Sequence, residues 1–181
     1  MIDTQPPAAA PDTIDAVAGL RDDSPVAALR RAREKVLRHT QLSEAALFDA
    51  ALFDAALPDL SLIERLHAAR YVAQRSSAHA LAATYHARLI EAGGTPDDIA
   101  RADADAFDAL PRRLGALLAH ARRLTLSPVD ARASDLAALK SAGFTTAAIV
   151  ALSQLVAFVA YQLRVAAAAS ALHTRVAREA A

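Results

Sequence analysis

One short stretch of the chain carries several side chains that could act together in proton transfer. If residues 62–75 form a helix, Glu64, His67, Tyr71 and Gln74 lie within about 80° of one another on one face. A carboxylate, an imidazole and a phenol on one stripe can line a polar pocket. An imidazole that is neutral near pH 7 can also accept a proton and return it. The stripe is therefore a candidate acid–base site.

Two further histidines lie on the next expected helix, residues 78–92. His79 and His86 are seven residues apart, which places them on one face and about 10 Å apart along the axis. They fall inside a broad apolar arc, so we expect both rings to be at least partly desolvated, which favours the neutral form. Helical ligands to a single metal ion are usually three or four residues apart, so we expect no metal at this pair of histidines. We also expect no cofactor.

Each of these residues also has an ordinary structural interpretation. Ser61 and Glu64 have the spacing of a capping box, in which the glutamate bonds back to the start of its own helix. His67 and Gln74 fit a solvated helix face equally well. A histidine inside an apolar arc is often a core residue whose hydrogen bonds are satisfied. The sequence leaves these alternatives open.

The stretch from Glu64 to Gly93, ERLHAARYVAQRSSAHALAATYHARLIEAG, resembles the core of the carboxymuconolactone decarboxylase and alkylhydroperoxidase D-like (AhpD-like) family. In that family a Cys-x-x-Cys pair is followed four residues later by a histidine. With that histidine aligned on His86, the two cysteine positions hold His79 and Ala82. The chain contains no cysteine, so it has no thiolate to attack a peroxide. The position of the family's glutamate, twelve residues before the first cysteine, holds His67.

The resemblance extends over roughly residues 12–175. It includes ALLAHARRLTL at 116–126 and DLAALKSAGFTTAAIVALSQLVAFVAYQLRVAAAAS at 135–170. It implies an all-α helical bundle built from antiparallel helical hairpins and assembled as a homo-oligomer, a dimer, trimer or hexamer. His86 alone keeps the identity of a family motif residue, and one hypothesis makes it the general base, with His79 or His67 as a second proton carrier and Tyr71 or Tyr85 as an orienting donor. The substrate would be a small organic acid or lactone.

The composition points to the same fold class and excludes several functions. Of 181 residues, 54% are apolar and five are glycine, and alanine is abundant, which favours helices throughout. Twenty basic and twenty acidic residues give no net charge, so we expect neither nucleic acid nor an anionic membrane surface as partner. The acidic, proline-containing amino terminus lacks the features of a signal peptide, so we expect a cytoplasmic protein.

Residues 147–172 are long and apolar enough to cross a bilayer. The same pattern fits a helix buried in a protein core or interface. Polar side chains at Ser153, Gln154, Gln162 and Arg164 interrupt the segment, so we favour burial in protein.

Capping residues and prolines place the helix boundaries, and no stretch alternates with the period of a strand. The expected helices cover 13–20, 24–38, 43–57, 61–75, 78–92, 95 onward, 111–124, 134–142 and 145 onward. The tandem pentapeptide ALFDA at 46–50 and 51–55 is interpreted as a local duplication within one helix. We divide the chain into a largely disordered tail (1–22), a helical extension (23–60) and the AhpD-like core (61–181).

Two functions are therefore expected from the sequence. One is cysteine-independent acid–base chemistry on a small organic acid or lactone, with Glu64, His67, Tyr71, His79 and His86 as candidate residues. The other is a non-catalytic oligomer that binds a small molecule or a partner protein. A peroxidase assignment would follow from the family resemblance alone, because the residues for the thiol reaction are missing.

Overall fold

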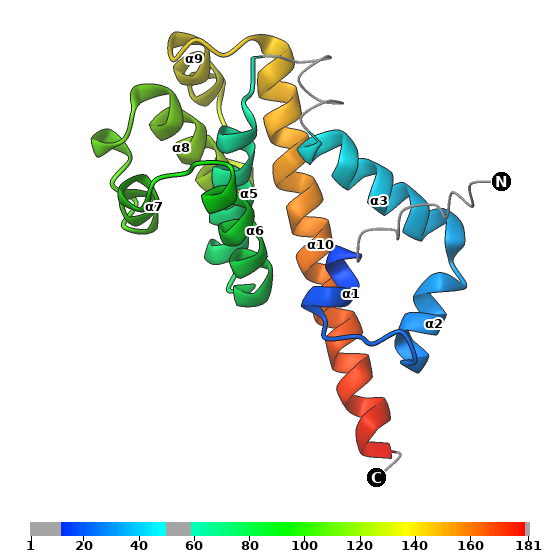
Figure 1. The fold of residues 1–181 in the computed structure, drawn as a ribbon. Helices are drawn as coiled ribbons and strands as arrows, with labels where there is room; N and C mark the ends of the chain where they lie inside the picture. The colour runs from blue at the N-terminus through cyan, green and yellow to red at the C-terminus, as the bar shows by residue number, and fades with distance from the viewer. Residues whose placement is uncertain (1–11, 50–58, 180–181) are drawn as a thin grey trace, which may run out of the picture.

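The computed structural model describes residues 12–49 and 59–179, and these residues are almost entirely helical (Figure 1). No strand occurs in these two ranges, which confirms the all-α class. The helices are α1 (Thr13–Val17), α2 (Pro25–Arg31), α3 (Glu34–Phe48), α5 (Leu62–Arg75), α6 (His79–Glu91), α7 (Pro96–Asp103), α8 (Arg112–Leu126), α9 (Ala133–Ser141) and α10 (Thr146–Glu179), with the 3₁₀ turns η1 (Phe107–Ala109) and η2 (Pro128–Asp130).

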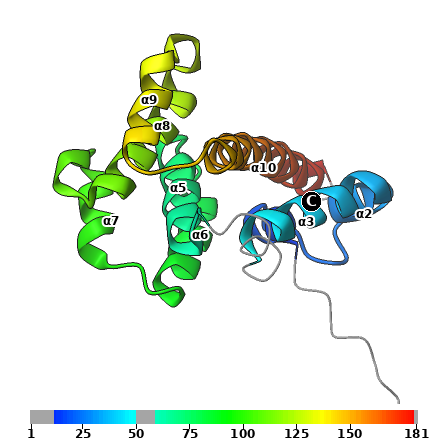
Figure 2. The ribbon, with the colours of Figure 1, turned by 90° about the horizontal axis from the view of Figure 1, so that it is seen from above.

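Helix α5 forms the centre of the core, since every residue from Arg65 to Ala73 is buried. Helices α6, α8 and α10 pack against it. Their shared core is built mainly of leucine, alanine and valine, with fully buried Leu66, Leu89, Leu117 and Leu152. Figure 2 shows α10 between the group α5–α9 on one side and α1–α3 on the other. Helix α10 therefore has to satisfy two different sets of neighbours.

The expected starts of α5 and α7 are confirmed, each with its predicted cap residue. The Ser61 hydroxyl accepts a hydrogen bond from the Glu64 backbone N–H at 3.3 Å, and Glu64 Oε2 accepts one from the Ser61 N–H at 2.9 Å. This reciprocal capping box starts α5 at Leu62, as predicted. At the start of α7 the Thr95 hydroxyl accepts a single hydrogen bond from the Asp98 backbone N–H at 3.2 Å, and Pro96 occupies the first helical position.

The expected start of a helix at Ser43 is wrong. Helix α3 already begins at Glu34 and runs through Ser43, whose hydroxyl donates to the His39 carbonyl at 2.8 Å. A serine that bonds one turn backward satisfies its hydroxyl inside a helix and gives no cap. The helix expected over 24–38 is correspondingly divided at Ala32–Arg33 into α2 and α3. The remainder of the 43–57 prediction, with the second pentapeptide, and residues 1–11 of the expected tail lie outside the described residues.

Polar contacts through Glu44 of α3 tie the amino-terminal helices to the core. The buried Tyr85 hydroxyl donates to Gln162 Oε1 at 2.6 Å, and Gln162 Nε2 donates to Glu44 Oε2 at 3.1 Å. The other Glu44 oxygen accepts from Thr13 at 2.7 Å and from Arg88 at 3.1 Å. Burial raises the pKa of Tyr85, so its hydroxyl stays protonated and can donate. One carboxylate thus connects α1, α3, α6 and α10.

Within the described part of the chain, α10 is the helix long and apolar enough to cross a membrane. In this fold 44% of the most apolar 18-residue stretch of α10 is buried inside the protein. Its most interior polar residue, Gln162, is fully buried and bonded to Tyr85 and Glu44.

We expect Gln162→Leu to lower the free energy of unfolding by about 2 kcal/mol, because Tyr85 and Glu44 each lose a buried partner. Urea unfolding followed by circular dichroism measures this change. The matched control is Gln154→Leu, at an exposed position of the same helix, which should change the free energy by less than about 0.5 kcal/mol. Equal effects of the two substitutions would show that the buried network contributes nothing.

Candidate functional site

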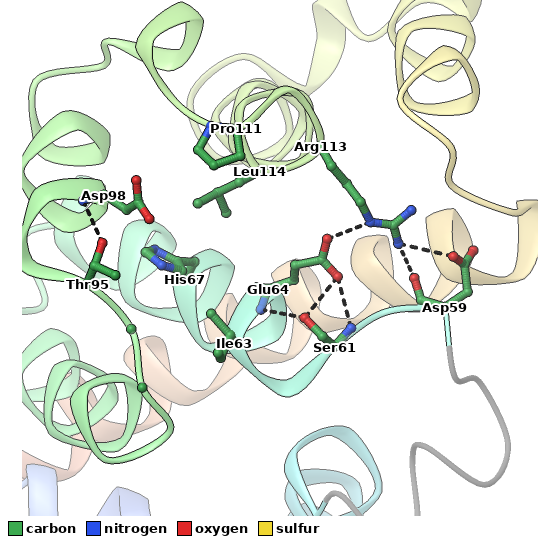
Figure 3. Close-up of a pocket in the computed structure, with 12 residues that line it drawn as sticks. Asp59, Ser61, Ile63, Glu64, His67, Thr95, Asp98, Pro111, Arg113 and Leu114 are labelled. Atoms are coloured by element: carbon green, nitrogen blue, oxygen red, sulfur yellow. Dashed lines mark hydrogen bonds and ion pairs between the residues drawn. The ribbon is translucent and has the colours of Figure 1, made fainter.

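A cleft of about 600 Å³ opens between the first half of α5, the link from α6 to α7 and the start of α8 (Figure 3). This volume is within the range of about 300–1,000 Å³ typical of small-molecule sites. Its wall contains four charged side chains, one histidine and one threonine: Asp59, Glu64, Asp98, Arg113, His67 and Thr95. Two of the residues predicted from the sequence, Glu64 and His67, therefore lie in this cleft.

Glu64 is engaged by its own helix and by α8. Besides closing the capping box, its Oε1 accepts a hydrogen bond from Arg113 Nε at 2.7 Å, and its Oε2 accepts one from the Ser61 hydroxyl at 3.1 Å. The capping interpretation of Glu64 is thus confirmed. With both oxygens bonded within the protein, its carboxylate serves mainly to shape the cleft.

Arg113 fixes the same wall of the cleft from α8. Its Nη2 donates to the carboxylate and the backbone carbonyl of Asp59, with 3.1 Å to the carboxylate, and its Nη1 donates to the Gly143 carbonyl at 2.9 Å. The guanidinium also lies 3.8 Å from the ring centroid of Phe144. The pKa of Asp59 is lowered, mainly because its carboxylate accepts a hydrogen bond from the Thr145 backbone N–H at 2.7 Å. The positive charge of Arg113 is therefore already paired with carboxylates of the protein.

His67 differs from its charged neighbours because it has no partner. Its side chain is 3% exposed, and it forms no hydrogen bond with any described residue. Some described side chains have a fully buried nitrogen without a partner, for example Nδ1 of His120. Neither ring nitrogen of His67 is of this kind, so the ring nitrogens of His67 can be reached from the cleft. Figure 3 shows the Asp98 carboxylate directed toward the ring. An imidazole held in the wall of a cleft with a free ring nitrogen can bond to a ligand.

Burial is the main influence on the protonation of this imidazole. It lowers the pKa of His67, while the charge of Asp98 acts in the opposite direction and that of Arg70 in the same one. The ring is accordingly neutral at pH 7, with one nitrogen able to accept a proton.

Tyr71 lies on α5 but belongs to a different set of contacts. Its hydroxyl donates to Asp105 Oδ1 at 2.6 Å, and Arg75 binds the same oxygen at 2.8 Å. Burial, followed by the hydrogen bond to Asp105, raises the pKa of Tyr71 to about 12. Tyr71 is not part of the cleft wall. The structure thus separates it from His67, although the two were expected on one stripe.

His79 and His86 also lie away from this cleft, and the desolvation expected for them is wrong in the single chain, where both are exposed. His79 borders a smaller hollow of about 150 Å³ between α6 and α10. His86 Nδ1 accepts a hydrogen bond from Arg70 Nε at 3.2 Å, and Arg70 is held by two bonds to Asp103. The apolar arc of α6 is broad, and the neighbouring helices leave these two positions uncovered.

Asp98, Arg113 and Thr95 were not recognised as site residues from the sequence. Thr95 and Asp98 fall at the start of the helix expected from 95 onward, and Arg113 falls at the start of the one expected over 111–124. Within the described ranges, no group of three or more His, Cys, Asp or Glu side chains is placed to hold a metal ion.

Comparisons with protein-family models, with curated proteins and with solved structures give no match. An assignment of function therefore depends on the residues of the cleft and their geometry.

The lowered pKa values predict how stability responds to pH. Burial lowers the pKa of both His67 and His120, so the unfolded chain takes up protons more readily than the folded one. Their contribution to stability is complete above the unfolded pKa of about 6.5 and is lost as pH falls below it. We expect urea unfolding to show lower stability at pH ~5.5 than at pH ~7.5.

The double variant His67→Gln/His120→Gln should lose less stability over this pH range than the wild type. The variant Gln154→Leu, at an exposed position without a titratable group, provides the control and should respond to pH as the wild type does. If the double variant and this control behave alike, burial does not set the protonation of His67.

Proposed function

We propose that the cleft binds a small, neutral organic molecule, of which a lactone is an example, and that His67 accepts a proton from it. The observation that carries this proposal is the almost fully buried, neutral imidazole that has no partner within the described protein. A buried polar group normally has a hydrogen-bond partner, so one left free in the wall of a cleft is suited to a ligand. A neutral imidazole can serve as the base in proton transfer.

The charges of the cleft favour a neutral ligand over an organic anion. Three carboxylates (Asp59, Glu64, Asp98) and one guanidinium (Arg113) are among the described wall residues, which leaves a formal surplus of two negative charges. The guanidinium is already bonded to two of the carboxylates. A carboxylate ligand would meet repulsion with no free cation in the wall to offset it.

Asp98 and Thr95 would assist the proton transfer. A carboxylate beside the ring stabilises the imidazolium that forms when His67 takes a proton, so Asp98 would promote the step without receiving the proton itself. The Thr95 hydroxyl accepts the Asp98 backbone N–H at 3.2 Å. Its own hydrogen is not used in this bond and is available to orient a ligand oxygen.

The resemblance to the carboxymuconolactone decarboxylase and AhpD-like family supports the same reaction class, since acid–base chemistry in such a fold requires no thiol. The resemblance would make His86 the base. We prefer His67, because His86 is exposed and already accepts a bond from Arg70. The homo-oligomer that the resemblance implies stays a prediction. A non-catalytic binder would use the same cleft, and turnover distinguishes it from an enzyme.

Exchange of the α-hydrogens of γ-butyrolactone in D₂O, followed by NMR with purified protein, tests the proposal. We expect the wild type to accelerate exchange and His67→Gln to lower the rate at least about 10²-fold, as for loss of a general base. Asp98→Asn should lower the rate to a smaller extent, because it removes a charge beside the imidazolium rather than the base.

His86→Gln is the matched control and should keep the wild-type rate. Loss of exchange in His86→Gln with activity retained in His67→Gln would overturn the assignment of the base. Binding of the lactone without exchange would identify a non-catalytic site. The ring-opened hydroxy acid should bind more weakly than the lactone, and the reverse order would contradict the electrostatic argument.

A further inference from the structure

A second hollow lies on the other side of α10, where α2 and α3 face it. It has a volume of about 440 Å³ and is lined mainly by apolar side chains of the three helices, among them Leu29, Val36, Val165 and Leu172. A neighbouring hollow of about 430 Å³ shares Val36 and Tyr161 with it. We call the two hollows together the α10 groove.

Several apolar side chains of the α10 groove are strongly exposed in the single chain. Leu29 is 67% exposed, Val36 50% and Leu172 51%. At the centre of the groove, the hydroxyls of Thr40 and Tyr161 lie 2.9 Å apart and connect α3 to α10. Contiguous exposed apolar surface of this kind is uncommon on soluble proteins unless it binds something.

The charges at the edge of the groove have one sign. The described residues that line the two hollows include Arg30, Arg33 and Lys35 and no carboxylate. Arg30 is neutralised by Asp12 at 3.1 Å and by Asp15 at 2.5 Å. Arg33 and Lys35, in contrast, form no ion pair with any described residue. Two cations beside an apolar channel therefore lack a counter-charge.

We propose that the α10 groove binds a small amphipathic carboxylate of the fatty-acid type. Its hydrocarbon chain would lie along α10 and its carboxylate beside Arg33 and Lys35. From Tyr161 to Leu172 the helix advances about 16 Å, enough for an extended chain of about ten carbons. The ligand would match both properties of the groove, its apolar lining and its unpaired positive charge.

A second copy of the chain matches the groove less well. Residues 33–40, at the start of α3, carry Arg33, Lys35 and Arg38 against the single acid Glu34. A symmetric dimer through this face would bring two such basic segments together, and like charges across an interface oppose association. An anionic ligand meets no such repulsion. This site is distinct from the His67 cleft, so it stands or falls independently of the proposed reaction.

Isothermal titration of the full-length protein with decanoate and with decanol tests the proposal, because the two probes share a chain length and differ in charge. We expect decanoate to bind about fivefold to tenfold more tightly than decanol. The double variant Arg33→Gln/Lys35→Gln should bind both probes equally. Leu29→Asp, at a position exposed enough to leave folding intact, should weaken both.

Two control variants should bind both probes as the wild type does. Arg112→Gln removes an exposed arginine of α8, and Val129→Asp places the same new charge at a position that is 92% exposed and outside the groove. Equal affinity of the wild type for decanoate and decanol would overturn the charge argument. A dimer that Leu29→Asp converts to a monomer, together with no decanoate binding, would identify a second copy as the occupant. Binding to anionic vesicles but not to free decanoate would identify a membrane surface instead.

Discussion

The guanidinium of Arg113 is the interaction on which the geometry of the cleft depends. It joins the start of α5 through Glu64, the segment before it through Asp59, and the turn before α10 through the Gly143 carbonyl. Asp59 in turn accepts the backbone N–H of Thr145 at the start of α10. A single cation thus links three helices that are far apart in the sequence. One guanidinium bonded to two carboxylates makes this wall rigid and leaves it with a formal charge of −1, which agrees with the preference of the cleft for a neutral ligand.

This arrangement explains why His67, rather than Asp59 or Glu64, is available to take a proton from a ligand. Carboxylates and guanidinium groups are costly to bury without partners, so the fold pairs them, and pairing removes them from reaction with a ligand. A neutral imidazole is less costly to bury, so His67 can stay unpaired at 3% exposure. Burial also lowers the pKa of the His67 ring, because a charged imidazolium is costly to desolvate. Burial without a partner thus leaves the ring both neutral at pH 7 and free to accept a proton.

The sequence could predict whatever depends on local contacts. Ser61 with Glu64, and Thr95 with Pro96, define helix starts within a few residues, and the structure places α5 and α7 where these signals predict. Ser43 misled because a serine inside a helix and a cap have the same identity and differ only in the bond that the hydroxyl forms. The cleft required contacts between residues far apart in the sequence, such as Glu64 with Arg113 over 49 positions and Asp59 with Arg113 over 54. Periodicity shows which residues share a face but not which face a neighbour covers, as His79 and His86 demonstrate.

The apolar excess of α10 has an explanation in this fold that does not require a bilayer. Leu152, Leu155 and Val159 are fully buried on the side of α5 and α8, which accounts for the amino-terminal half of the helix. Gln162 follows at the point where α3 and α6 meet α10, and its two bonds to Tyr85 and Glu44 satisfy it inside protein. In a lipid phase these two bonds would have to be replaced at a cost. Beyond Gln162 the apolar positions Val165 and Leu172 face the α10 groove, where α2 and α3 cover them only in part.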